Sequence, residues 1–309
     1  MTGPAPFANP PPARPTVRSL IRYGAAEFEH AGLAYGHGTD NAVDDAAALV
    51  FHALGLDHAK ATDAYGRRPD AAGVARVLEL YARRIAERVP AAYLMGKMWF
   101  AGLEFEVDPR VIVPRSPFAE LIAARFRPWI DPARVHRVLD VGTGSGCIAI
   151  ACAAAFPSAR VDAVDVSPAA LEVAARNVAR HRVVDRLELH LGDVYAPLGE
   201  RRYDLIVSNP PYVSDAEMEA LPEEYLREPD LALRAGADGL DVARRIIAGA
   251  AERLEPGGVL VVEVGDSDER LAAAFPRLPF TWLEFEHGGG GVFVINREQL
   301  AAGTAPRAR

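Results

Sequence analysis

The residues most able to do chemistry stand at the ends of apolar, strand-like runs. The first group is Asp140 followed by the stretch from Gly142 to Gly146, which has the spacing G-x-G-x-G. Glycines in such a turn let the backbone approach a ligand closely. Cys147 stands where the dinucleotide pattern G-x-G-x-x-G would place its third glycine, so that fingerprint is not met.

Two further aspartates follow the next two apolar runs. Asp165 lies roughly 20 residues beyond the glycines, where an acid can accept hydrogen bonds from both hydroxyls of a ribose. Asp193 follows Gly192 at the end of the third run. Each aspartate alone could equally be a helix or turn cap. Taken together with the glycines, they indicate a nucleoside ligand.

The fourth group is Asn209-Pro210-Pro211-Tyr212, which follows the apolar run from Tyr203 to Val207. Proline ends sheet pairing, and a Pro-Pro pair alone is typical of a rigid turn. This pair, however, leaves a strand at the same sheet edge as the three aspartates, which makes a functional role the stronger interpretation.

The elements that must position these residues alternate between strand and helix. Such alternation predicts right-handed βαβ units and an α/β fold with a doubly wound, mostly parallel seven-stranded sheet over residues 117–300. The last two runs, joined only by His287 and four glycines, should pair antiparallel at the sheet edge. The strands are expected at 135–141, 160–164, 187–191, 203–207, 258–264, 280–285 and 291–295, and the helices at 145–155, 168–180 and 241–254.

The rest of the chain predicts a second, smaller domain. Apolar residues recur at intervals of three and four from 43 to 54 and from 74 to 89, so we expect residues 16–99 to form a helical domain. Residues 100–116 suggest a β-hairpin linker around Asp108-Pro109, and Ser116 should cap a helix that Pro117 opens. The proline-rich residues 1–15 and the tail 301–309 are expected to be disordered. His37 stands without ligand-spaced partners and is interpreted as a structural loop histidine.

Composition narrows the function classes. The 309 residues carry a formal net charge of −8, which does not favour binding to phosphate backbones. Cys147 and Cys152 match no zinc motif, and we predict no metal site. No apolar run approaches the ~20 residues of a membrane span, and the first residues lack a signal-peptide core. We therefore expect a cytoplasmic protein without membrane contact.

Three stretches carry a resemblance to a known family. LDVGTGSG, VDAVDVSPAAL and DLIVSNPPYV resemble motifs of class I S-adenosylmethionine-dependent methyltransferases, and N-P-P-Y resembles the signature of the branch that methylates planar amide or exocyclic amine nitrogens. Over about 17–300 the chain is similar to the protein N5-glutamine methyltransferases. YGHGTDN at 35–41, the stretch 92–122 and PFTWLEFEHGGGGVFVI at 279–295 look like the branch that acts on universal large-subunit ribosomal protein three.

The resemblance implies S-adenosylmethionine as cofactor and S-adenosylhomocysteine as its product. It implies that Asp165 binds the ribose, that Asp193 and Val194 contact the adenine, and that Asn209 borders both cofactor and substrate. The methionine end would be bound by Asp140, Gly142, Thr143, Gly144, Ser145 and Gly146. Related enzymes can carry an aromatic residue where Val194 stands, so stacking on the adenine should be weaker here.

The chemistry of an amide explains the prolines. An amide NH2 offers two donors and no usable acceptor, because its lone pair is delocalised. The side-chain oxygen of Asn209 can accept one hydrogen and the carbonyl of Pro210 the other, while Pro211 restricts Pro210 to an extended conformation. Tyr212 can lay its ring on the planar amide. We therefore expect Asn209, Pro210 and Tyr212 to be catalytic and all four residues to bind substrate.

Several substrates remain open from the residues alone. Seven acidic residues between 215 and 230 favour a basic protein over DNA, although such a run is also typical of a solvated surface. The sister enzymes that methylate peptide release factors typically carry P-R-P-D-T-E where this chain has Pro114 to Glu120, so the ribosomal protein is preferred. The alternatives are the release factor, N6-adenine in nucleic acid, and a non-catalytic ribosome-assembly factor. The target glutamine and the oligomeric state stay open.

Overall fold

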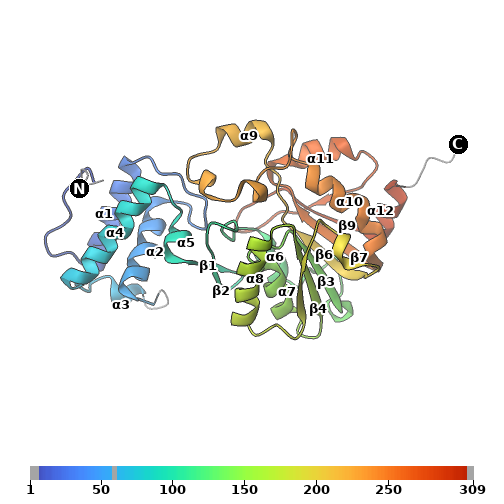
Figure 1. Cartoon of the computed structure of the whole chain (residues 1–309), viewed down its shortest axis with the longest axis horizontal. Helices are drawn as coiled ribbons and strands as arrows, with labels where there is room; N and C mark the ends of the chain where they lie inside the picture. Colours follow the sequence, from blue (N-terminus) through green and yellow to red (C-terminus); the bar gives the residue numbers. More distant parts are fainter. Residues whose placement is uncertain (1–6, 58–60, 305–309) are drawn as a thin grey trace. The chain divides into compact units, whose positions relative to one another are not determined.

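The computed structural model describes residues 7–57 and 61–304, which form two compact units. The first unit contains the described residues up to Met98, together with Val107–Pro109 and Pro222–Arg227. The second contains Trp99–Glu106, Arg110–Leu221 and the described residues from Glu228 onward. Figure 1 colours both units along the sequence. Each unit is therefore built from segments that are not contiguous in the sequence.

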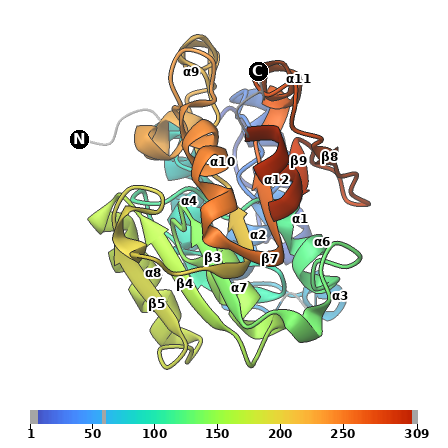
Figure 2. The same cartoon turned by 90° about the vertical axis from the view of Figure 1, so that its right-hand side faces the viewer.

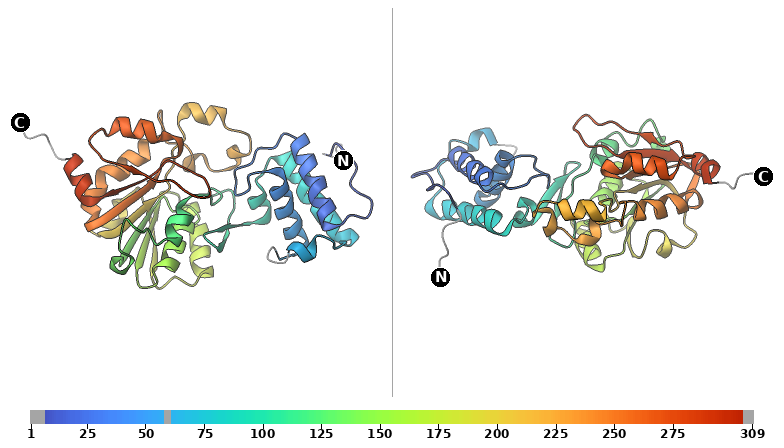
Figure 3. Two further views of the ribbon diagram at one scale, coloured as in Figure 1. Left: turned by 180° about the vertical axis from the view of Figure 1, so that it is seen from behind. Right: turned by 90° about the horizontal axis from the view of Figure 1, so that it is seen from above.

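Three helices form the frame of the first unit, and Figure 3 shows them side by side. They are α1 (Val17–His30), α2 (Ala42–Leu54) and α4 (Ala71–Glu87), with the short α3 (Ala61–Ala64) and α5 (Ala91–Met95) beside them. Thr16, Asn41 and Asp70 each accept a backbone N–H at a helix start, which is the usual N-cap arrangement. Their apolar stripes meet in one core.

The segment Pro222–Arg227 is part of this unit although it comes late in the chain. The carboxylate of Glu224 is buried, accepts the Ala34 N–H at 3.1 Å and lies 3.6 Å from Arg84 and 3.2 Å from Arg88. The ring of Tyr225 lies 4.2 Å from that of His37, centroid to centroid. His37 is buried at this contact, so it packs within the unit.

The proline-rich start of the chain is partly described. Residues 7–15 have no regular secondary structure, yet Phe7 packs on the Tyr23 ring, and the buried Glu27 accepts hydrogen bonds from Ala8 and Asn9. This part of the expected tail is therefore held against α1. Residues 1–6 and 305–309 lie outside the described residues, while residues 301–304 are not a tail but the last turn of helix α12.

The β-hairpin differs from the expectation in its position. Strands β1 (Lys97–Phe100) and β2 (Leu103–Glu106) pair around Ala101-Gly102, and Asp108-Pro109 follows the second strand. Both turn residues have positive φ, 48° and 76°, which is the requirement of the tight two-residue turns that join antiparallel strands. The Asp-Pro pair is the stronger turn signal in the sequence, but it lies outside the hairpin.

The described residues of the second unit build the predicted seven-stranded sheet, in the order β5-β4-β3-β6-β7-β9-β8. Strands β3 to β7 are parallel, and β9 pairs antiparallel with both β7 and β8, as predicted for the edge. The strands are β3 (Arg137–Val141), β4 (Arg160–Asp165), β5 (Leu187–Leu191), β6 (Tyr203–Ser208), β7 (Leu254–Glu263), β8 (Thr281–Trp282) and β9 (Val292–Asn296).

Helices cover both faces of this sheet, as Figure 2 shows. One face packs against α6 (Phe118–Ala123), α7 (Cys147–Ala155) and α8 (Pro168–Arg180). The other packs against α10 (Asp241–Arg253), α11 (Asp268–Ala274) and α12 (Arg297–Thr304). Successive residues of each central strand are therefore buried on opposite faces, which explains why the strands read as continuous apolar runs. The short α9 (Asp215–Ala220) follows β6.

No helix among the described residues is long and apolar enough to cross a membrane.

Candidate active site

A cavity of about 310 Å³ opens at the carboxyl edge of the parallel strands, within the second unit. Such an edge is where open α/β sheets bind ligands, and the volume suits a nucleoside-sized molecule. The turns after β3, β4, β5 and β6 all contribute to it. Its lining includes Gly142, Gly144, Asp165, Asp193, Val194 and Asn209. These are six of the residues that the sequence predicted for the cofactor.

The turn after β3 is held open by backbone contacts. The N–H groups of Gly142 and Thr143 both donate to the Val164 carbonyl, at 2.8 and 3.0 Å, and Gly144 donates to the Asp165 carboxylate at 2.8 Å. Gly142 and Gly144 have φ values of 74° and 54°, a conformation that is costly for other residues. The glycines thus place bare backbone along the cavity.

Asp140 supports this turn from below. Its side chain is fully buried, and one oxygen accepts the Thr143 hydroxyl at 2.6 Å and the Ala149 N–H at 3.1 Å. The other oxygen, Oδ1, has no hydrogen-bond partner among the described residues. Burial raises the pKa of Asp140 to about 7. A buried carboxylate with an unsatisfied acceptor is costly, so a positive charge brought near it by a ligand would stabilise it.

Asp165 is ready to accept hydrogen bonds from a ligand. Each of its oxygens accepts one backbone N–H, from Gly144 and Ser167, both at 2.8 Å, and each keeps a further lone pair. Burial raises its pKa above the ordinary value. Asp193, two strands from the glycine turn, is instead exposed and forms an ion pair with Arg245 of α10.

Asn209 lies at the boundary between two cavities. It lines the larger one and also a second cavity of about 20 Å³, which is bordered by Pro210, Tyr212, Ile112 and Arg115 among others. The motif that follows β6 therefore touches both the nucleoside-sized cavity and a separate small one. The small cavity has room for about one water-sized group, so it marks a gap beside Asn209.

Not every predicted residue faces the larger cavity. Asp140, Thr143, Ser145 and Gly146 do not line it, and the Ser145 carbonyl accepts a hydrogen bond from Asn177. Sequence reasoning missed Arg245 and the Arg110–Ile112 stretch, which do line the cavity. Arg245 lies on a helix 52 residues beyond Asp193, and no spacing rule connects the two.

Ser116 also differs from its expected role. The helix begins at Phe118, one residue later than predicted, and the Ser116 hydroxyl donates to Glu263 at 2.5 Å. It still accepts the Phe118 N–H at 3.2 Å.

The acidic run after the motif is largely neutralised by arginines. Asp215 and Asp230 both pair with Arg234, and Glu217 pairs with Arg270. The buried Glu228 forms a two-pronged ion pair with Arg115 at 2.5 and 2.6 Å. Glu223 pairs with Arg227, and Glu224 is buried within the helical unit. The run is therefore not the repulsive surface that its composition suggested.

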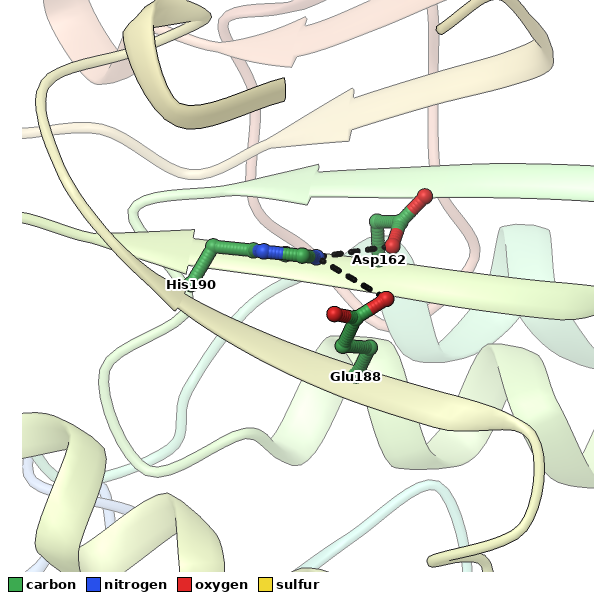
Figure 4. A group of neighbouring side chains, drawn as sticks. All are labelled: Asp162, Glu188 and His190. Atoms are coloured by element: carbon green, nitrogen blue, oxygen red, sulfur yellow. Dashed lines mark hydrogen bonds and ion pairs between the residues drawn. The ribbon is translucent and has the colours of Figure 1, made fainter. Parts of the chain in front are cut away.

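A second polar cluster lies within strands β4 and β5, away from the larger cavity. Figure 4 shows Asp162, Glu188 and His190, three residues of the described chain whose ligand atoms could surround a metal ion. One nitrogen of Arg201, however, lies within 3.1 Å of an atom of each of them, at 2.7 Å from Asp162. This guanidinium already supplies the positive charge, so we assign no metal to the cluster.

Comparison with known proteins agrees with this geometry. The family described as the methyltransferase small domain matches residues 128–238. The crystal structure of the hMettl16 catalytic domain in complex with MAT2A 3′UTR hairpin 1 is similar in fold, with a TM-score of 0.50 and 18% identity over 74% of this chain and 83% of that one. The sheet order is that of the class I S-adenosylmethionine-dependent methyltransferase fold.

Sequence relatives define the family more narrowly. The chain is 50% identical to the ribosomal protein uL3 glutamine methyltransferase of Bordetella pertussis, over 92% of this chain and 96% of the relative. It is 49% identical to the protein of the same name from Xanthomonas campestris pv. campestris, over 94% of each. The chain belongs to the family of ribosomal protein uL3 glutamine methyltransferases, as the sequence motifs predicted.

Proposed function

We propose that this protein transfers a methyl group from S-adenosylmethionine to the side-chain N5 of a glutamine in ribosomal protein uL3. The observation that carries the proposal is the position of Asn209, which borders both the nucleoside-sized cavity and the small cavity beside it. The names of the relatives point to the same substrate.

The cofactor fits the larger cavity. Asp165 would accept the ribose hydroxyls, Asp193 and Val194 would face the adenine, and the glycine turn would follow the methionine end. Asp140, whose Oδ1 has no donor among the described residues, does not line this cavity, so it would favour a cationic ligand through its charge and through the glycine turn. When bound, S-adenosylmethionine supplies an electrophilic methyl group on its sulfonium.

The chain's own contribution is to hold the amide. Asn209 and the Pro210 carbonyl would accept the two amide hydrogens, and Pro211 fixes the separation of these acceptors. Tyr212 would cover the plane of the amide. Holding a nucleophile and an electrophile in line contributes roughly 7–11 kcal/mol of barrier reduction in the best cases. A dry cavity favours a reaction that disperses the sulfonium charge.

We still prefer a protein substrate to DNA, but the reason is no longer the negative charge of the acidic run 215–230. Because most acids after the motif are paired with arginines, their repulsion of phosphate is weaker than the sequence suggested. The preference rests instead on the relatives, whose similarity covers 92% of this chain and includes the helical unit. We propose that this unit selects the ribosomal protein and that no DNA partner is involved.

The test offers the purified protein labelled S-adenosylmethionine and three substrates in parallel. These are uL3, free and in assembling large subunits, a peptide release factor, and duplex DNA. We expect label on one glutamine of uL3 alone, located by mass spectrometry of the digested protein.

The other outcomes would each contradict part of the proposal. Label on the release factor would keep the chemistry and change the substrate. Label in DNA would exclude the amide as the acceptor. Absence of transfer, with the cofactor still bound, would favour a non-catalytic role in ribosome assembly.

A further inference from the structure

Tyr212 is held more tightly than a loop residue that only follows a Pro-Pro turn. Its hydroxyl donates to Glu263 at 3.3 Å, and its ring lies against Gly265, where an added Cβ would come within 2.7 Å of the ring. Gly239 lies against the Tyr212 carbonyl, because a Cβ added to this glycine would lie 2.4 Å from the carbonyl oxygen. Ring, hydroxyl and backbone are thus each fixed by a different element.

Glu263 is an unusual partner for that hydroxyl. It ends strand β7, its side chain is 5% exposed, and its second oxygen accepts the Ser116 hydroxyl at 2.5 Å. Burying a carboxylate is costly unless hydrogen bonds compensate for the lost water. Here the two compensating donors are Ser116, two residues before α6, and Tyr212 of the N-P-P-Y motif. A neutral residue would satisfy simple packing at lower cost.

We propose that Glu263 is a positioning residue of the methyl-transfer site, which fixes the Tyr212 hydroxyl so that the ring stays aligned over the substrate amide. Ser116 holds Glu263 from the other side. The inference rests on the proposed function, because the ring needs an alignment only if a planar group binds beside it. Neither Tyr212 nor Glu263 lines the larger cavity, so the effect should fall on the chemical step and not on the cofactor.

The charge state of Glu263 gives the proposal a distinctive signature. Burial raises the pKa of Glu263 to about 7, against the lowering effects of Ser116, Tyr212 and the nearby Arg115. The pKa of Tyr212 is raised too, chiefly by burial and then by Glu263, with Asp266 adding to it, so the phenol stays neutral. An ionised Glu263 accepts from both hydroxyls, whereas a protonated one needs an acceptor of its own.

The experiment is a double-mutant cycle of Glu263→Gln and Tyr212→Phe, followed from pH 6 to pH 8.5. In the unchanged protein, kcat should fall as the pH drops below about 7. We expect each single variant to lose about tenfold to a hundredfold in kcat, to lose this pH dependence, and to keep its KM and cofactor affinity. The double variant should lose no more than either single one, because both act through the same bond.

Asp162→Asn is the matched control. Asp162 is also buried and also accepts a tyrosine hydroxyl, that of Tyr203 at 3.0 Å, but it lies within strand β4 (Figure 4) and does not line the larger cavity. Its kcat and pH profile should equal those of the unchanged protein. Ser116→Ala is a second, milder variant. It removes one hydrogen-bond donor from Glu263, so the pKa of Glu263 should rise. The pH below which kcat falls should therefore be higher in this variant.

Two results would overturn the proposal. One is a Glu263→Gln protein whose kcat is unchanged, or whose kcat still falls below about pH 7 as in the unchanged protein. The other is additive losses in the double variant. All ratios are taken on whichever substrate the unchanged protein labels. Transfer to a release factor instead of uL3 would therefore refute the proposed substrate, while the cycle would still decide the role of Glu263.

Discussion

At the scale of single residues, Asn209 connects the two halves of the site. It is the residue of the N-P-P-Y motif that borders both the larger and the smaller cavity. Gly142 of the glycine turn, where an added Cβ would lie 3.9 Å from Pro210, lines the larger one. A side chain so placed can hold the amide and still touch the cofactor. Its loss should therefore affect the reaction far more than binding.

Asn209→Ala tests this division of roles. We expect kcat to fall by about 10²- to 10³-fold, the usual cost of removing one fixed polar partner from a reacting group. Cofactor affinity, measured by isothermal titration calorimetry, should change by less than about fivefold, a loss below roughly 1 kcal/mol. A variant that binds cofactor normally and still methylates at the original rate would refute the clamp.

At the scale of elements, the parallel strands and their turns were predictable, because the chemistry lies where strands end. The strand predicted at 160–164 forms as Arg160–Asp165, and the helix Pro168–Arg180 has the predicted bounds. Periodicity and turn glycines encode such elements locally. The ion pair between Asp193 and Arg245 was not predictable, because it depends on how helix α10 packs on the sheet.

The hairpin and Glu224 show the same limit. A two-residue turn at Ala101-Gly102 leaves a weaker trace in the sequence than Asp108-Pro109, yet it is the turn that forms. Glu224 reads as one acid in a charged run, but it is buried against Arg84 and Arg88. Burial of a charge cannot be recognised from spacing when its partners lie more than a hundred residues away.

Glu224→Ala should release the segment Pro222–Arg227 from the helical unit. It would leave Arg84, which is 1% exposed, with one carboxylate partner fewer, and breaking a buried ion pair typically costs about 3–5 kcal/mol. Hydrogen exchange followed by mass spectrometry should show faster exchange in 222–227 and in the loop around Ala34. Glu223→Ala, whose ion pair with Arg227 is exposed, is the control and should leave exchange there unchanged.

At the scale of the whole molecule, buried acids make stability depend on pH. The pKa of Glu263 is raised from 4.5 to about 7, so folding takes up a proton between these values. Its contribution to stability is complete below about pH 4.5 and is lost as the pH rises through about 7. At about 1.4 kcal/mol per pKa unit, the loss is on the order of 3 kcal/mol.

Glu263→Gln should therefore be relatively more stable at high pH. The difference in free energy of unfolding between variant and unchanged protein, from urea titrations, should shift in favour of the variant between pH 5 and pH 8. A difference that stays constant with pH would mean that Glu263 is ionised throughout and that its burial is fully compensated.

The division of the chain into two units limits how its gene can recombine with related genes. The helical unit is completed by six residues from far downstream, Pro222–Arg227, and Glu224 among them touches Arg84 and Arg88. A gene exchange that replaced only the first hundred codons would set these arginines against a foreign segment. The two stretches should therefore descend together, and any chimera built to move specificity between sister enzymes has to carry both.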